Sequence, residues 1–286
     1  MRARAAAVEK ANEVRRLLVA LLALAVVGCN GPVESETERE RIPAAAATAP
    51  APETETTIHV FVALCDNDSQ GIVPVPRHLG DGDDPKGNLY WGAMYGTRTF
   101  LERSDAWDLV ATADAPGEAV LERVVLRHPA TGAYLVADAY RGSRIRQAVE
   151  AFLDAAAGNS PQVWRVGQAA LGIHGAAELV AYVGHNGLME FEVACPPRGG
   201  GVGGRAAVVL ACRSRPYFQP LLGELGCRPM LLTTGLMAPE AYTLEAVLEA
   251  WLAGQDAAGL RDAAAGAYGK YQKCGLRAAK RLFHAE

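Results

Sequence analysis

The sequence has no apolar stretch long enough to cross a lipid bilayer as a helix. Its longest uninterrupted apolar run, residues 17–27, has eleven residues, whereas a helix needs about 20 to span the hydrocarbon core. Basic residues are not in excess either, since 28 Lys and Arg face 32 Asp and Glu and the formal net charge is −4. This mildly acidic balance argues against nucleic acid as a partner.

Zinc-binding cysteine patterns are also missing. The chain contains no CxxC or CxxxH spacing, which structural zinc sites commonly use. The acidic residues Asp81, Asp83 and Asp84 lack the Glu that closes an EF-hand calcium loop. We therefore expect no metal and no cofactor. Apart from Cys29 the chain has five cysteines, and because five is an odd number at least one of these thiols is unpaired or bonded to another molecule.

The short apolar run has the features of an export signal. It is preceded by five basic residues, Arg2, Arg4, Lys10, Arg15 and Arg16, and followed by Gly28 and Cys29. This arrangement is typical of a secretory signal peptide. Residues 26–29, Val-Val-Gly-Cys, resemble the bacterial lipobox, and the resemblance implies cleavage before Cys29 and lipidation of its thiol. We expect a lipoprotein signal peptide over 1–28 and a protein anchored in the bacterial cell envelope, at the outer membrane or the periplasmic face of the inner membrane.

The segment that follows Cys29 has the composition of a tether. Residues 30–57 are rich in Glu, Thr, Ala and Pro and contain few large apolar side chains, a composition that favours disorder. We expect a linker over 29–57 that holds one α/β domain, residues 58–286, away from the bilayer. Because residues 1–28 carry five basic and two acidic side chains, their removal changes the formal net charge from −4 to −7.

Near-continuous apolar runs alternate with helical patterns along the expected domain. The runs are 58–64, 121–126, 179–183, 206–211 and 229–233. Such runs favour strands buried on both faces of a mainly parallel sheet. Residues 134–137 should pair with 121–126, because Pro and Gly between them favour a hairpin. Helices are predicted over 145–157, 242–252 and 276–283. The alternation predicts a three-layer α/β/α sandwich.

Two of the predicted core strands lead directly into reactive residues. The strand 179–183 runs through Gly184 into His185, and the strand 206–211 runs into Cys212. In a parallel sheet both strands end at the same edge, where open α/β sheets bind their ligands. Neighbouring strands lie about 4.8 Å apart, so the two side chains can come within the reach of a His–Cys catalytic pair.

These strand ends resemble the motifs of the clan CD cysteine peptidases, which include caspases, legumains and gingipains. The family's strand into His-Gly is matched by LVAYVG-His185-Asn186-Gly187, and its strand into Ala-Cys by AAVVL-Ala211-Cys212. The resemblance covers a small part of the domain. It implies a caspase-like fold and a peptide or protein substrate. It also implies that Cys212 is the nucleophile, His185 the general acid and base, and that backbone N–H groups of Gly187 and Cys212 form the oxyanion hole.

One departure from the family leaves other functions open. Asn186 separates His185 from Gly187, whereas the family has Gly directly after His. It is therefore open whether Gly187, Asn186 or neither donates to the oxyanion. Because a displaced donor would cripple acyl transfer, a non-catalytic binding lipoprotein on the same scaffold is an alternative. A third interpretation is a lipoprotein that binds a small ligand in a closed apolar pocket at the sheet edge.

Polar residues after the first predicted strand provide candidates for substrate binding. In clan CD this strand end lies near the pocket for the residue that precedes the scissile bond, so the resemblance implies that Asp66 or Asp68 selects a basic side chain. Solvated turn carboxylates are the alternative interpretation. Cys65 is the rival nucleophile, but it lacks a matching strand-end His, and a disulfide or a buried thiol explains it better.

Overall fold

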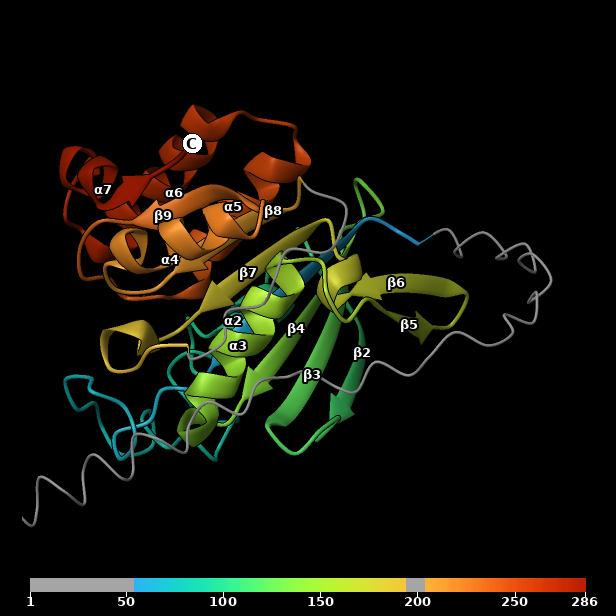
Figure 1. Cartoon of the computed structure of the whole chain (residues 1–286), viewed down its shortest axis with the longest axis horizontal. Coiled ribbons are helices and arrows are strands. Elements are labelled where there is room, and N and C mark those ends of the chain that lie inside the picture. The colour runs from blue at the N-terminus through green and yellow to red at the C-terminus, as the bar shows by residue number, and fades with distance from the viewer. Residues whose placement is uncertain (1–53, 194–203) are drawn as a thin grey trace, which may run out of the picture. The chain divides into compact units, whose positions relative to one another are not determined.

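Eight strands form one sheet in the structure, a computed structural model that describes residues 54–193 and 204–286. Their order is β10 (Phe283–His284), β9 (Arg228–Thr233), β8 (Ala206–Leu210), β7 (Leu179–Val183), β1 (Thr57–Ala63), β4 (Tyr134–Tyr140), β3 (Val120–Arg127) and β2 (Asp108–Asp114). The five neighbours from β9 to β4 run parallel. β10, β3 and β2 are antiparallel to their neighbours. The predicted α/β class with a mainly parallel sheet is confirmed (Figure 1).

The central strands are mainly apolar because helices cover both of their faces. Every residue of β1, β7 and β8 is buried. On one face, Phe61 packs with α3 (Ile145–Ala156) and α4 (Ser214–Glu224). On the other face, Val60 and Val62 pack with α5 (Ala241–Leu252) and α6 (Ala257–Gln272). Each fully buried Val, Leu or Phe contributes about 1.5–3 kcal/mol, so this double burial stabilises the part of the sheet that positions the candidate site.

Most predicted elements match the observed ones within a residue or two. The hairpin between β3 and β4 is confirmed, and so are α3, α5 and α7 (Leu276–Leu282). Elements that the sequence did not predict are α2 (Thr97–Glu102), α4, α6, β2, β10 and the hairpin of β5 (Gln162–Val166) and β6 (Ala169–Ile173). This hairpin forms a separate two-stranded sheet (Figure 1).

The strand order reverses direction between β1 and β7. The second parallel strand in the chain, β4, lies on one side of β1, whereas β7, β8 and β9 follow one another on the other side. Open α/β sheets bind ligands beyond the carboxyl ends of their strands, at the point where such a reversal leaves a crevice. The carboxyl ends of β1 and β7 are therefore the place in this fold where a ligand site is expected.

The expected signal peptide, Cys29 and nearly all of the expected linker lie outside the described residues. Within residues 54–193 and 204–286, no helix is both long enough and apolar enough to cross a membrane.

Candidate active site

The register of two parallel strands places His185 and Cys212 just beyond neighbouring strand ends, at one edge of the sheet. Val183 of β7 lies opposite Leu210 of β8, and the Gly184 N–H donates to the Leu210 carbonyl oxygen at 3.2 Å. His185 and Cys212 each follow this residue pair by two positions. Since paired strands lie about 4.8 Å apart, the structure brings both predicted residues to neighbouring strand ends.

The turn after β7 is held by a glycine and a buried tyrosine. Gly184 has a φ of 145°, and a Cβ atom there would lie 2.8 Å from the Ala63 carbonyl oxygen. Only glycine combines this φ with such close backbone approach. The Tyr182 hydroxyl, which is fully buried, donates to the His185 carbonyl oxygen at 2.7 Å. These contacts determine where the chain leaves the sheet, and therefore where the His185 side chain begins.

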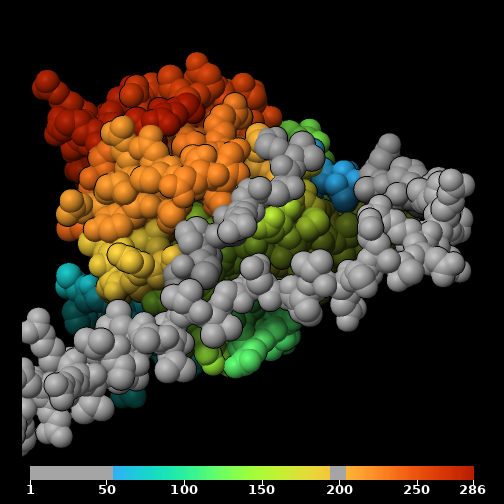
Figure 2. Space-filling model, in the orientation of Figure 1, coloured from blue at the N-terminus to red at the C-terminus, as the bar shows by residue number. Residues whose placement is uncertain are grey.

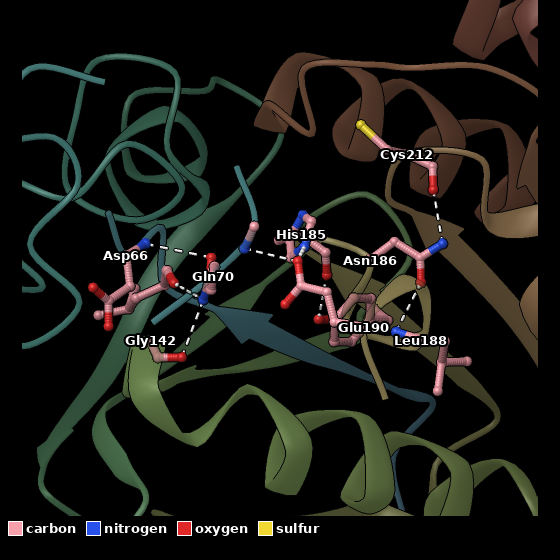
Figure 3. Close-up of polar contacts among 11 residues, drawn as sticks. Asp66, Gln70, Gly142, His185, Asn186, Leu188, Glu190 and Cys212 are labelled. Atoms are coloured by element: carbon pink, nitrogen blue, oxygen red, sulfur yellow. Dashed lines mark hydrogen bonds and ion pairs between the residues drawn. The ribbon is translucent and has the colours of Figure 1, made fainter. Parts of the chain in front are cut away.

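The His185 ring contacts a carboxylate that the sequence did not single out. Nε2 of His185 lies 2.6 Å from Oε1 of Glu190, and the two side chains are 8% and 35% exposed (Figure 3). Because a carboxylate only accepts hydrogen bonds, Nε2 carries the proton. Nδ1 has no hydrogen-bond partner among the residues that the structure describes. Glu190 lies five positions after His185 in the same loop, and that proximity is the only sequence signal for it.

Cys212 lies at a sharp turn from β8 into α4. Arg213, the next residue, has left-handed backbone angles, φ 47° and ψ 40°, and is the N-cap of the eleven-residue helix. The left-handed conformation of Arg213 makes the change of direction after Cys212 abrupt. The Cys212 thiol is partly buried.

A buried hydroxyl network supports this turn from below. The Ser214 Oγ donates to the Val209 carbonyl oxygen at 3.1 Å. The Thr233 N–H donates to the Ser214 Oγ at 2.8 Å, and the Ser214 N–H donates to the Thr233 Oγ1 at 3.0 Å. All of these atoms lie in the interior, where satisfied networks are rigid. The network fastens the first turn of α4 to the ends of β8 and β9.

The thiol of Cys212 contacts the loop after β9. Its Sγ accepts from the Met237 N–H at 3.3 Å and lies 3.4 Å from the Met237 carbonyl oxygen. The described structure has no hydrogen bond between Cys212 and the His185 ring. In Figure 3 no dashed line joins the Cys212 sulfur to the His185 ring, whereas one joins the Asn186 amide to the Cys212 carbonyl oxygen. Catalytic hydrogen bonds are often long without substrate and shorten when it binds.

The inserted Asn186 joins the two strand ends. Its side chain is fully buried, its Nδ2 donates to the Cys212 carbonyl oxygen at 2.8 Å, and its Oδ1 accepts from the Leu188 N–H at 3.2 Å. Both ends of the amide are therefore used. Asn186 acts as a tie between the loop after β7 and the turn that carries Cys212.

The two expected oxyanion donors differ in availability. The Gly187 N–H donates to the His185 carbonyl oxygen at 3.1 Å, so it is already engaged. Gly187 also has a packing reason to be glycine, because a Cβ there would lie 2.5 Å from the Phe191 ring. The Cys212 N–H has no hydrogen-bond partner within the described part of the chain and is free to donate to a developing oxyanion.

Asp66 and Asp68 line a cavity at the carboxyl end of β1. The cavity measures about 480 Å³, and it is lined by residues 66–69, 77, 80–83 and 143, which include four Asp and one Arg. Asp66 is buried and caps the local turn, since its carboxylate accepts from the Asp68 N–H at 2.9 Å and from the Ser69 hydroxyl at 2.6 Å. Asp68 is exposed. The cavity is polar and acidic, unlike the closed apolar pocket of the small-ligand interpretation.

The loop of this cavity contacts the loop that carries His185. The Gly71 N–H donates to Glu190 Oε1 at 2.7 Å, and Gln70 Nε2 donates to the Leu64 and Gly142 carbonyl oxygens at 2.8 and 3.1 Å. Figure 2 shows the two loops, coloured cyan and yellow, next to each other at the surface. The hydrogen bond between Gly71 and Glu190 thus joins the loop of the acidic cavity to the loop that carries His185.

The rival nucleophile Cys65 is a buried thiol, as one of the two alternatives predicted. It is fully buried, and burial raises its pKa to about 11. A thiol with this pKa remains protonated near neutral pH and is a poor nucleophile. None of the four cysteines within the described ranges, Cys65, Cys212, Cys227 and Cys274, forms a disulfide. Nor does the described part of the chain contain three or more His, Cys, Asp or Glu placed to hold a metal ion.

Comparison of the chain with models of known protein families, with curated proteins and with solved structures gave no match.

Proposed function

We propose that this protein is a membrane-anchored, exported hydrolase of the cysteine peptidase type, with Cys212 as nucleophile and His185 as general acid and base. The observation that carries the proposal is the register of β7 and β8, which puts the two residues at neighbouring carboxyl ends. That edge adjoins the reversal of strand order, where α/β sheets bind ligands. A caspase-like arrangement of the layers is part of the proposal, supported by helices on both faces of the sheet.

The residues present suffice for acyl transfer. His185 takes the proton of the Cys212 thiol as the sulfur attacks the substrate carbonyl carbon, and the N–H of Cys212 donates to the oxyanion that forms. The carbon–nitrogen bond then breaks while His185 gives its proton to the leaving amine. Water, deprotonated by His185, attacks the thioester, and its carbon–sulfur bond breaks. The products are a carboxylic acid, an amine and the restored thiol.

The acidic cavity supports a substrate with a basic side chain next to the scissile bond. Four Asp line it against one Arg, so its charge complements Lys or Arg. Asp68 is exposed and available for pairing, whereas Asp66 is occupied in capping the turn. We therefore assign the contact with a basic side chain to Asp68 and the shape of the cavity to Asp66. The substrate is a peptide or protein at the cell envelope, reached from a lipid anchor on Cys29.

Labelling by an electrophilic peptide tests the catalytic assignment. A fluorescent peptide acyloxymethyl ketone with a terminal Arg should label the wild-type protein at one site, and Cys212→Ala should abolish the label. Cys274→Ala is the matched control, because this free thiol is exposed and its loss should leave labelling unchanged. Unchanged labelling of Cys212→Ala, or labelling that is lost with Cys274→Ala instead, would contradict the assignment.

The second candidate function is a non-catalytic protein that binds basic peptides at the same edge. The engaged Gly187 N–H and the buried Asn186 favour it, because they leave fewer donors for an oxyanion. In this case the wild-type protein would bind an Arg peptide without being labelled by the ketone. Cys212→Ala would then bind the peptide as tightly as the wild type.

A further inference from the structure

A single carboxylate joins His185 to the loop of the acidic cavity. Oε1 of Glu190 lies 2.6 Å from Nε2 of His185 and 2.7 Å from the Gly71 nitrogen. We propose that Glu190 is a positioning residue that sets the tautomer and orientation of the His185 ring. This inference rests on the proposed function, because it assigns a third member to the Cys212–His185 pair.

The tautomer follows from the donors and acceptors around the ring. Since the carboxylate can only accept, Glu190 keeps the proton of neutral His185 on Nε2. The lone pair is then on Nδ1, which has no partner within the described residues. A base whose second nitrogen is held by a third group is the arrangement that cysteine and serine nucleophiles use. Nδ1 is therefore the nitrogen that exchanges protons with Cys212 and the substrate.

Charge adds to this geometric role. When His185 takes a proton during acyl transfer, the imidazolium has a carboxylate at 2.6 Å. The His185 ring is only 8% exposed, so its attraction to the carboxylate is stronger than between two groups fully in solvent. Glu190 therefore stabilises the charged form of the ring at the step where that form appears.

Glu190 is itself held in place by a glycine. An added Cβ at Gly71 would lie 2.1 Å from Oε1 of Glu190, so any larger residue at position 71 must push the carboxylate away. Gly71 is exposed and its φ is not in the left-handed region, so alanine fits its backbone. Gly71→Ala thus displaces Glu190 without removing it, which gives a second and independent way to disturb the ring.

Kinetics with a fluorogenic Arg peptide test the proposal. Glu190→Ala should lower kcat by about 100-fold or more while KM changes less than about 3-fold, since loss of the orienting carboxylate in a Ser–His–Asp triad lowers kcat by about 10⁴. Gly71→Ala should show the same pattern. Glu190→Gln should retain more activity than Glu190→Ala, because an amide oxygen can still accept from Nε2. Glu192→Ala, an exposed carboxylate of the same loop, is the matched control and should leave both constants unchanged.

Nitrogen-15 NMR of the histidine ring supplies a readout that a purely structural role would not change. The His185 signals should report a protonated Nε2 in the wild type and a mixture of tautomers in Glu190→Ala and Gly71→Ala. An unchanged tautomer or an unchanged kcat in both variants overturns the inference. If the wild type is labelled at Cys212 but the variants hydrolyse normally, only this inference fails. If the wild type is not labelled at all, the proposed function itself fails.

Discussion

Two histidine–carboxylate pairs in this molecule have similar chemistry and different surroundings. His185 and Glu190 lie at the carboxyl edge of the sheet, whereas His59 of β1 and Asp138 of β4 lie within it at 3.1 Å, with side chains 0% and 1% exposed. In the inner pair both ring nitrogens are used, because the His174 N–H donates to Nδ1 of His59 at 3.0 Å. In the outer pair one ring nitrogen has no partner within the described residues.

The charge of the carboxylate in the inner pair is also balanced by a buried arginine. Arg123 of β3 donates to both oxygens of Asp138, at 2.6 and 2.7 Å. Burial alone would raise the pKa of Asp138, but hydrogen bonds from Arg123 and His59 outweigh it and hold the pKa far below the usual range. Burial lowers the pKa of His59, which keeps that ring neutral. A His–carboxylate pair can thus act as a catalytic site only where one nitrogen of the ring has no partner and a reactive group lies nearby.

The largest loss of stability is expected when the inner pair is broken. Asp138→Ala leaves the Arg123 guanidinium buried, with 8% exposure, and without its partner. We expect a loss of about 3–5 kcal/mol in the free energy of unfolding, the usual result of breaking a buried ion pair from one side. Urea denaturation of the two proteins measures it.

The control for this variant is Asp83→Ala. It breaks an exposed ion pair with Arg141, whose side chains are 67% and 38% exposed, and should change the unfolding free energy by less than about 1 kcal/mol. Equal losses of unfolding free energy in Asp138→Ala and Asp83→Ala would contradict the expected difference between the buried ion pair and the exposed one.

The second largest effect is expected on the pH dependence of the unfolding free energy. Burial lowers the pKa of His174, beside His59, to about 4 from its usual 6.5. Between these two values the unfolded chain binds a proton that the folded protein does not. The unfolding free energy therefore falls as pH decreases from 6.5 to 4, by at most about 1.4 kcal/mol per pH unit for this group. His174→Asn should flatten the fall, and Asn tolerates the positive φ of 53° at this position.

Urea denaturation at pH 7, 6, 5 and 4 measures this slope. His59 contributes a slope of the same sign because its pKa is also lowered, so part of the fall should persist in the variant. An identical slope in the wild type and in His174→Asn would show that the folded protein does not keep His174 neutral.

The smallest effect on stability is expected at the outer pair. Glu190 is about one-third exposed, so Glu190→Ala should change the unfolding free energy by less than about 1 kcal/mol. Thermal unfolding followed by circular dichroism checks this value. A loss comparable to that of Asp138→Ala would mean that the outer pair is structural as well, and the comparison of the two pairs would fail.

The sequence predicted those parts of the fold whose burial requires a recognisable run of apolar residues. β1, β7 and β8 are buried on both faces, so their apolar runs identify them nearly to the residue. β2 and β5 were missed because most of their side chains are exposed or partly exposed and no apolar pattern results. α6 was missed because two of its four buried residues are alanines and the helix contains three glycines.

The sequence likewise predicted some residues of the candidate site and missed others. His185 and Cys212 were predicted because they follow directly from buried strands, and strand register alone brings them to one edge. Glu190, Gly71 and Met237 were not, because their contacts join loops that have no repeating pattern. Asp66 was singled out for its charge, but only the structure places it as the cap of its own turn.

By itself, the sequence predicted the buried core strands of the sheet, the edge at which they end and the presence of His185 and Cys212 there, because burial in the core is visible in residue type and spacing. The tertiary structure decided which carboxylate holds His185, which backbone N–H groups are occupied and which cysteine is inaccessible. Those outcomes depend on residues distant in sequence, such as Gly71 and Glu190 at 119 positions apart. Such residues meet only when the loops of separate strands close over the same edge.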